Sequence, residues 1–249
     1  MAARYMRHLL RAGRPAEASA FADGWQGRDE GYLLVPYQSV AWRQTGDPRW
    51  QWLEGDERLV GVYDLADRLP PLDALADRLR ALHLCSHHPL EQSLRGGTQT
   101  DGPLFSRIEP EIRALRAAII GAVEAHAAQL PPPVAGHPTL IAKRGPIAFS
   151  GSWSVRLTGA GFHVNHVHPM GWLSSALYVA LPDSMGTGDQ GWLKLGEPQA
   201  ELGVDLPPFR TVEPRPGRLV LFPSTMWHGT IPFDAGERMT VAFDVARPQ

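Results

Sequence analysis

The rhythm of apolar residues changes near residue 135, and this change constrains the fold more than any other feature of the chain. Before it, apolar residues recur at helical spacing, as in residues 72–82 and 112–130. Pro110 and the prolines at 131–133 frame the second run, which indicates a long helix between them. After about residue 140, apolar and polar residues alternate in short runs separated by Gly and Pro, as expected for β-strands.

The first fifty residues also contain helical runs, which are interrupted at two glycines. A helix, a turn at Gly13 and a second helix are expected first. A further helix that ends in Gly46-Asp47-Pro48 follows about thirty-three residues later. That spacing is similar to a tetratricopeptide repeat, although two copies are too few for a solenoid. A few packed capping helices explain the pattern equally well.

Several short strands are expected in the second part of the chain. They cover residues 148–158, 172–181, 191–195, 209–212, 218–222 and 239–245. Short strands at this spacing favour a sandwich or barrel. We therefore predict an α+β protein in which helices in residues 1–135 pack on a C-terminal double-stranded β-helix (jelly roll) in residues 136–249. The two parts are expected as separate regions or as one domain with a shared core.

Three histidines of the second part have the pattern of a metal site. Residues two apart in a strand face the same side, so His166 and His168 project together while His163 has the opposite parity. His228, on a late strand, supplies a third imidazole if that strand packs across from the first. Three imidazoles on one face of an octahedron leave three positions open for substrates. Together these three histidines predict a metal centre, with His163 either a supporting partner of the ligands or a structural residue.

Arg238 follows His228 by ten residues, and Thr240 faces the same side of the expected strand. A guanidinium group is a fixed fork of donors that matches a carboxylate. This pair is therefore expected to hold the far carboxylate of a dicarboxylic co-substrate whose other end chelates the metal. The alternative is a surface arginine at the start of a strand.

The order of these motifs resembles the 2-oxoglutarate- and iron(II)-dependent oxygenases, and in particular one bacterial family of them. The matching segments are His166-Val-His168-Pro169, Ser174 to Tyr178-Val with Pro182, Pro214 to Pro223, His228, Pro232 and Arg238-Met-Thr240. The resemblance covers roughly the last hundred residues. It implies a double-stranded β-helix that uses Fe(II), 2-oxoglutarate and oxygen, and releases succinate and CO₂ while hydroxylating a substrate C–H bond. It also adds Tyr178 to the residues expected to bind the co-substrate, and tetratricopeptide-like helices before the oxygenase part.

One position departs from the wider superfamily, which usually has His-x-Asp or His-x-Glu where this chain has His166-Val-His168. A neutral imidazole in place of a carboxylate raises the charge of the site by one. That change affects the metal preference, the reactivity or the affinity for the co-substrate. Asp244 has the same strand parity as Arg238 and offers a carboxylate nearby.

Two other classes of protein fit parts of this pattern. A cupin-type metalloenzyme that does not use 2-oxoglutarate also has clustered histidines on a β-barrel. However, the glutamate expected a few residues after His-x-His is absent here, and Arg238 would have no role. The second alternative is a non-catalytic jelly-roll binding module that is recruited through its N-terminal helices. Iron and 2-oxoglutarate binding separate these classes from the oxygenase.

The substrate is not specified by any motif, and a small molecule or a peptide is expected. Candidate substrate-binding residues are Trp153, Arg156, Trp172 and Trp192, with Gln99 in the Gly-rich loop 92–100. That loop is equally well explained as a turn-rich connection. The N-terminal helices are a candidate surface for a protein partner.

Charge and composition exclude several other classes. The net charge of −2 and the absence of Lys/Arg runs argue against nucleic-acid binding. No apolar run approaches the eighteen residues of a membrane span, and the first ten residues do not read as a signal peptide. A single cysteine, Cys85, excludes an internal disulfide and favours the reducing cytoplasm, and its neighbours do not mark it as a nucleophile. The remaining histidines are expected on the surface or in packing roles: His8, His83, His87, His88, His126 and His137.

Overall fold

The computed structural model describes residues 1–84, 93–183 and 186–248. The helices are α1 (Ala2–Arg11), α2 (Pro15–Asp23), α3 (Val35–Thr45), α4 (Arg49–Glu54), α5 (Leu72–Leu82) and α6 (Pro110–Gln129). The strands are β1 (Gly61–Asp64), β2 (Leu94–Gln99), β3 (Phe149–His163), β4 (Gly171–Ala180), β5 (Leu193–Leu195), β6 (Arg210–Val212), β7 (Arg218–Pro223), β8 (His228–Thr230) and β9 (Glu237–Ala246). The expected fold class, α+β, is therefore confirmed.

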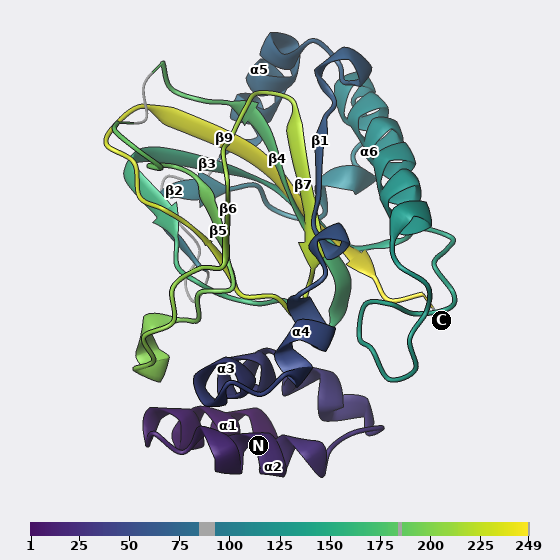
Figure 1. Ribbon diagram of the computed structural model, residues 1–249. Coiled ribbons are helices and arrows are strands. Elements are labelled where there is room, and N and C mark those ends of the chain that lie inside the picture. The colour runs from purple at the N-terminus through teal and green to yellow at the C-terminus, as the bar shows by residue number, and fades with distance from the viewer. Residues whose placement is uncertain (85–92, 184–185, 249) are drawn as a thin grey trace.

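Two antiparallel sheets form the β part (Figure 1). The larger has the strand order β1-β7-β4-β9-β3-β2, and the smaller has the order β6-β5-β8. All six strands predicted from alternation are present. Strands β1 and β2 lie within residues 1–135, the part expected to be a helical region, and form the two edges of the larger sheet.

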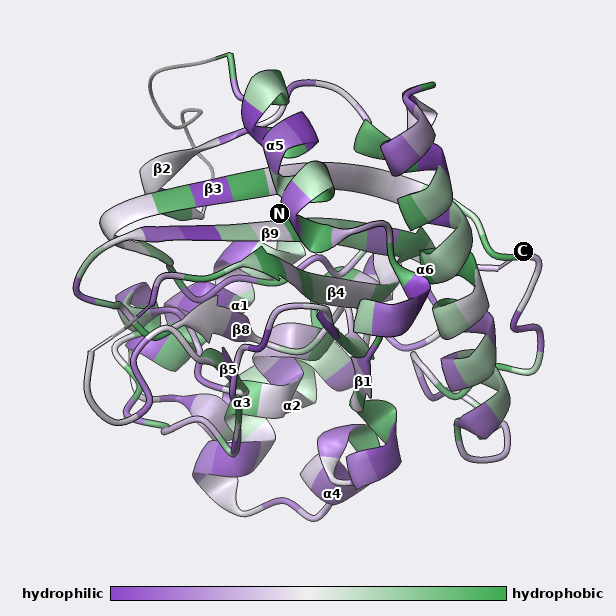
Figure 2. Ribbon diagram, turned by 90° about the horizontal axis from the view of Figure 1, so that it is seen from above, coloured by the Kyte–Doolittle hydropathy of each residue, from purple (hydrophilic) through white to green (hydrophobic). Residues whose placement is uncertain are grey.

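Helices α5 and α6 cover one face of the larger sheet, and the smaller sheet lies on its other side (Figure 2). The apolar cluster under these helices contains Leu75 and Ile119 from the helices and Leu177 and Val241 from the strands. All four side chains are inaccessible to solvent. One core therefore joins residues from both sides of position 135, as the shared-core alternative requires. The boundary at 135 itself stays a prediction.

Helices α1, α2 and α3 form a layer below the sheets in the view of Figure 1. Gly13 and Gly46 have φ values of 68° and 67°, and each ends a helix of this layer in the left-handed or turn backbone that glycine adopts without strain. The helix–turn–helix pairs expected from the sequence are therefore present, whereas α4 has only six residues. Their relation to tetratricopeptide repeats stays a prediction.

The helical layer is joined to the β part through Trp227 and Val167. Both side chains belong to the apolar cluster that contains Met6, Leu9 and Val40 of the helices. The Trp227 Nε1–H donates a hydrogen bond to the Pro36 carbonyl at 2.9 Å. Among the described residues, no helix is long and apolar enough to cross a membrane.

Candidate active site

Backbone pairing brings His166 and His228 together. The two residues form an antiparallel bridge in which each amide N–H donates to the other's carbonyl, at N···O distances of 2.9 and 3.0 Å. The His168 amide donates to the Ser224 carbonyl at 2.9 Å. Strand β3 ends at His163, so the segment carrying His166 and His168 is an extended connection to β4 rather than part of the strand. The sequence predicted the shared side of His166 and His168 but assigned it to a strand.

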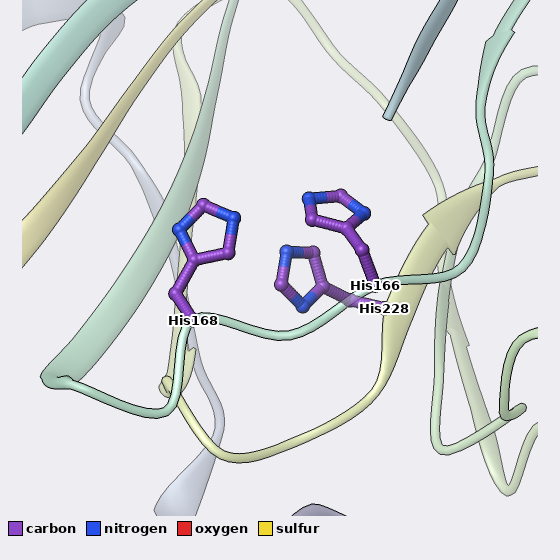
Figure 3. A group of neighbouring side chains, drawn as sticks. All are labelled: His166, His168 and His228. Atoms are coloured by element: carbon purple, nitrogen blue, oxygen red, sulfur yellow. The ribbon is translucent and has the colours of Figure 1, made fainter. Parts of the chain in front are cut away.

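The three histidine rings surround one small space (Figure 3). The ring centroids of His166 and His228 are 4.2 Å apart, and His168 lies 5.0 Å from His166 and 5.3 Å from His228. One potential ligand atom from each of the three residues lies within 4.8 Å of the other two. The structure therefore assembles the predicted set from segments about sixty residues apart in the sequence.

Hydrogen bonds fix which nitrogen of each ring faces this space. The Nδ1–H groups of His166 and His228 donate to the carbonyls of Val164 and Met226, at 2.8 and 3.0 Å. A carbonyl oxygen only accepts, so Nδ1 carries the proton and Nε2 is left unprotonated, with a lone pair. Burial, with the neighbouring His168, lowers the pKa of His166 to about 4. Burial also holds the pKa of His228 well below 6.5. Both rings are therefore neutral near pH 7, as metal ligation requires.

His168 has a different partner, because its Nδ1–H donates to the carboxylate of Asp244. The distance to Asp244 Oδ2 is 2.5 Å, and Asp244 Oδ1 accepts the hydroxyl proton of Ser174 at 2.6 Å. Ser174 and Ser224 are themselves 2.9 Å apart at their hydroxyl oxygens. The carboxylate expected near the site is thus hydrogen-bonded to His168 on the side of its ring that carries Nδ1.

His163 also lies at the site, although its strand parity is opposite to that of His166. Its Nδ1 and the Nε2 of His166 lie 3.0 and 3.3 Å from the Ser93 hydroxyl. The chain leaves the strand conformation after His163, so parity does not extend to His166. Ser93 was not identified from the sequence. Its position in a loop rich in hydrogen-bond donors was the only feature that pointed to a role at the site.

A cavity of about 290 Å³ opens beside the three histidines. This volume is close to the lower end of small-molecule sites, roughly 300–1,000 Å³. Four of the residues predicted to bind co-substrate or substrate line it: Gln99, Trp153, Arg238 and Thr240. The Trp153 ring is stacked near His168, with centroids 5.8 Å apart.

Arg238 is a buried cation on the wall of this cavity. Its exposed fraction is 2%, and its Nε has no hydrogen-bond partner among the residues that the structure describes. In the same part of the chain no carboxylate forms an ion pair with it. Its guanidinium carbon lies 5.0 Å from the centre of the Tyr178 ring. Tyr178 does not itself line the cavity, so its ring supports Arg238 from behind.

Three predicted substrate residues are placed elsewhere. Trp172 is 1% exposed, packs in the core under α5 and α6, and donates its Nε1–H to the Thr139 carbonyl at 2.8 Å. Arg156 lies on the other face of β3, where it forms an ion pair with Glu237 at 2.5 Å. Trp192 is not among the cavity residues. Cys85, His87, His88 and Gln92 lie outside the described residues.

Comparison with protein families identifies the part of the chain that builds this site. Residues 151–244 match the family described as "Putative 2OG-Fe(II) oxygenase". For this segment, the match agrees with the resemblance to the 2-oxoglutarate- and Fe(II)-dependent oxygenases that the sequence predicted. A comparison with curated proteins found no match.

Several solved structures are similar to this chain at low sequence identity. The viral collagen prolyl hydroxylase of Paramecium Bursaria Chlorella virus-1, in its 2OG complex, is 13% identical over 78% of this chain and 98% of its own, with a TM-score of 0.50. A Pseudomonas putida prolyl-4-hydroxylase is 18% identical over 77% of this chain and 94% of its own, with a TM-score of 0.44. A Trichoplax adhaerens prolyl hydroxylase, in complex with a peptide fragment, is 12% identical over 82% and 93%, with a TM-score of 0.48. The first of these supports the jelly-roll fold.

Proposed function

We propose that this chain hydroxylates a C–H bond of a substrate, with Fe(II) held by His166, His168 and His228 and 2-oxoglutarate held beside it. The observation that carries the proposal is the meeting of two features in one cavity. Three imidazoles gather at one end, and the buried Arg238, without an acidic partner among the described residues, lies on its wall. One feature suits a divalent metal, and the other suits a carboxylate.

The histidine set fits Fe(II). Imidazole is a common ligand of iron, and a site with few protein ligands leaves positions open for substrates. The hydrogen bonds from Nδ1 of His166 and His228 to backbone carbonyls hold both rings with an unprotonated Nε2. Together with 2-oxoglutarate and oxygen, bound iron would supply the oxidising power for hydroxylation. The protein contributes the orientation of the donors and a buried cavity.

Arg238 fits the far carboxylate of 2-oxoglutarate. A buried guanidinium group loses the hydration of its charge, and this loss is offset only when an anion binds to it. The Tyr178 ring and the walls of the cavity fix its direction, and the Thr240 hydroxyl on the same side of β9 is a second donor. The cupin alternative gives no role to this cation, and a non-catalytic module gives no role to either feature.

Gln99 and Trp153 are proposed as substrate contacts, because both line the cavity from strands β2 and β3. An amide and an indole contact a small molecule or a peptide equally well, so both substrate classes belong to the proposal. The expected cytoplasmic location, and the expected protein partner of the N-terminal helices, stay predictions. In the described residues the apolar faces of these helices pack on Trp227.

Anaerobic titration with Fe(II) and then with 2-oxoglutarate tests the metal and co-substrate sites. The wild-type protein is expected to bind both and to release succinate in air. His228→Ala removes one of the proposed ligands and is expected to abolish metal binding, whereas His163→Ala is expected to retain it. Wild-type protein that binds iron but not 2-oxoglutarate would favour the cupin alternative, and protein that binds neither would favour the binding module.

Arg238→Ala tests the co-substrate contact directly. Removing one partner of a buried charge pair costs about 2–5 kcal/mol, so 2-oxoglutarate affinity should fall roughly thirty- to several-thousand-fold. Arg238→Lys keeps the charge but loses the fork, and we expect an intermediate loss. Arg156→Ala is the matched control, since Arg156 lies on the neighbouring strand and points away from the cavity. Equal affinity in Arg238→Ala and wild type would remove Arg238 from the site.

A further inference from the structure

Asp244 is the one acidic residue among the described residues that line the cavity. Its carboxylate accepts two hydrogen bonds, from His168 Nδ1 at 2.5 Å and from the Ser174 hydroxyl at 2.6 Å. The side chains of His168 and Asp244 are only 23% and 14% exposed. The contact is therefore partly screened from water, and the negative charge acts at short range on the ring.

The three proposed ligands are not equivalent, because only His168 is bonded to a charged acceptor. His166 and His228 donate their Nδ1–H groups to neutral backbone carbonyls, whereas His168 donates to a carboxylate. A hydrogen bond to an ionised acceptor is roughly twice as strong as a neutral one. Such a bond also raises the basicity of the other ring nitrogen, the atom that would bind the metal.

The position of this contact coincides with the departure in the sequence. His168 stands where the wider superfamily usually has Asp or Glu, so the histidine set brings no negative charge to the metal. The carboxylate of Asp244, on strand β9, is hydrogen-bonded to Nδ1 of His168 and so lies one imidazole ring further out. The negative charge is thus retained at the site but displaced outward.

We propose that Asp244 is a positioning residue that supplies, through the ring of His168, the negative charge that a carboxylate ligand supplies in related sites. It fixes the orientation and tautomer of His168 and makes its Nε2 a stronger donor than those of His166 and His228. Ser174 donates a hydrogen bond to this carboxylate and also contacts the Ser224 hydroxyl. The inference rests on the proposed function, because it assigns His168 as a metal ligand.

The test is a double-mutant cycle in which affinity for Co(II), a spectroscopic stand-in for Fe(II), is measured with the full-length protein. Asp244→Asn removes the charge with little change of shape and should weaken binding by about 10–100-fold, the usual effect of losing an outer partner of a ligand. His168→Asp alone places a second carboxylate next to Asp244, and two negative charges at this distance repel each other. It should therefore also bind weakly.

The double variant His168→Asp with Asp244→Asn gives the result that a structural role would not give. It moves the single carboxylate from the outer position to the ligand position, so it should bind Co(II) at least about tenfold more tightly than His168→Asp alone. A purely structural role for Asp244 predicts that the two losses add. The visible absorption bands of bound Co(II) should also shift in Asp244→Asn, since the ligand field of His168 changes.

Ser174→Ala is the matched control, because it removes one hydrogen bond to Asp244 but leaves its charge. A loss of about fivefold in affinity is expected, equivalent to about 1 kcal/mol. Thermal unfolding of each variant shows that it is folded. Wild-type protein that does not bind metal overturns the proposed function and this inference together. Wild-type protein that binds metal, with equal affinity in Asp244→Asn or additive losses in the double variant, overturns this inference alone.

Discussion

The two faces of strand β9 differ in chemistry. Met239 and Val241 face the helices and belong to an apolar core without solvent access, whereas Arg238, Thr240 and Asp244 line the cavity. Successive residues of this strand therefore point alternately into the apolar core and into the cavity of the proposed metal site. The same strand gives each face a fixed position relative to the other, because side chains of a strand alternate.

This difference separates the sources of stability from those of function. The core face gains free energy from burial of apolar surface, about 25 cal/mol per Å². The cavity face instead holds a cation without an acidic partner in the described part of the chain, and such a group costs stability in the absence of ligand. Substitutions on the two faces should consequently change the free energy of unfolding in opposite directions.

Leu177→Ala on the core face should have the largest effect. Leu177 is fully buried and pairs with Val241 across strands β4 and β9. Truncating a buried leucine costs about 2–5 kcal/mol, since it leaves a cavity. Chemical denaturation should show this loss, while Fe(II) affinity of the folded protein stays the same. A variant that loses metal affinity but not stability would show that the two faces are not separable.

The helix side also contains a buried titratable group, His126, that departs from this apolar character. His126 of α6 is 1% exposed and shares a hydrogen bond with the Tyr63 hydroxyl at 2.8 Å. Burial lowers its pKa from 6.5 to about 4. Because the folded-state pKa is the lower one, the stabilising effect of the neutral ring is complete above pH 6.5 and is lost as the pH falls toward 4.

His126→Asn should remove this part of the acid sensitivity. One proton contributes about 1.4 kcal/mol per pH unit, so the ring accounts for about 3 kcal/mol between pH 6.5 and 4. Denaturation at several pH values should show a shallower decline for the variant than for wild type over this window. Comparing the two proteins cancels the effects of the other buried histidines. Parallel curves would mean that His126 stays neutral throughout.

Arg238→Met on the cavity face should change stability in the opposite direction from Leu177→Ala. Replacing the buried cation by an apolar side chain of similar length removes an uncompensated charge and should stabilise the ligand-free protein by about 1–3 kcal/mol. The stabilisation that 2-oxoglutarate gives to the wild type should disappear in the variant. Thermal unfolding with and without 2-oxoglutarate, in the presence of metal, measures both effects. A destabilised variant would indicate that Arg238 serves packing.

The periodic parts of the fold were predictable from the sequence, and the edges were not. Helices α5 and α6 and the long strands followed from their spacing. Strand β1 has only four residues, and β2 contains Gly96 and Gly97, which hide any alternation. A Cβ at Gly97 would lie 2.3 Å from the Arg156 carbonyl oxygen, so close strand approach, rather than a periodic pattern, explains the glycine.

The site was predictable where spacing alone brings residues together. Alternation along β3 places Arg156 on the opposite face from Trp153, so the two residues cannot both line the cavity. Trp172 gave no such signal, because β4 is buried on both faces and its residues do not alternate. The contacts of Asp244 and Ser93 with the histidines depend on tertiary structure, since they join segments more than sixty residues apart.

Trp227→Phe should have the smallest effect and tests whether the N-terminal helices support the site. Trp227 precedes His228, and its indole packs on α1 and α3 while donating to the Pro36 carbonyl at 2.9 Å. Phenylalanine keeps most of the apolar contact but leaves that carbonyl without the indole donor, which costs about 1 kcal/mol. If the helical layer fixes the direction of His228, Co(II) affinity should fall by about twofold to fivefold along with stability.

Tyr37→Leu is a matched control within the layer, because Tyr37 contacts the Trp227 ring edge-on at 5.7 Å but is not the residue next to His228 in the chain. Unchanged metal affinity in Trp227→Phe, with the expected loss of stability, would show that the helical layer contributes to folding but not to the metal site.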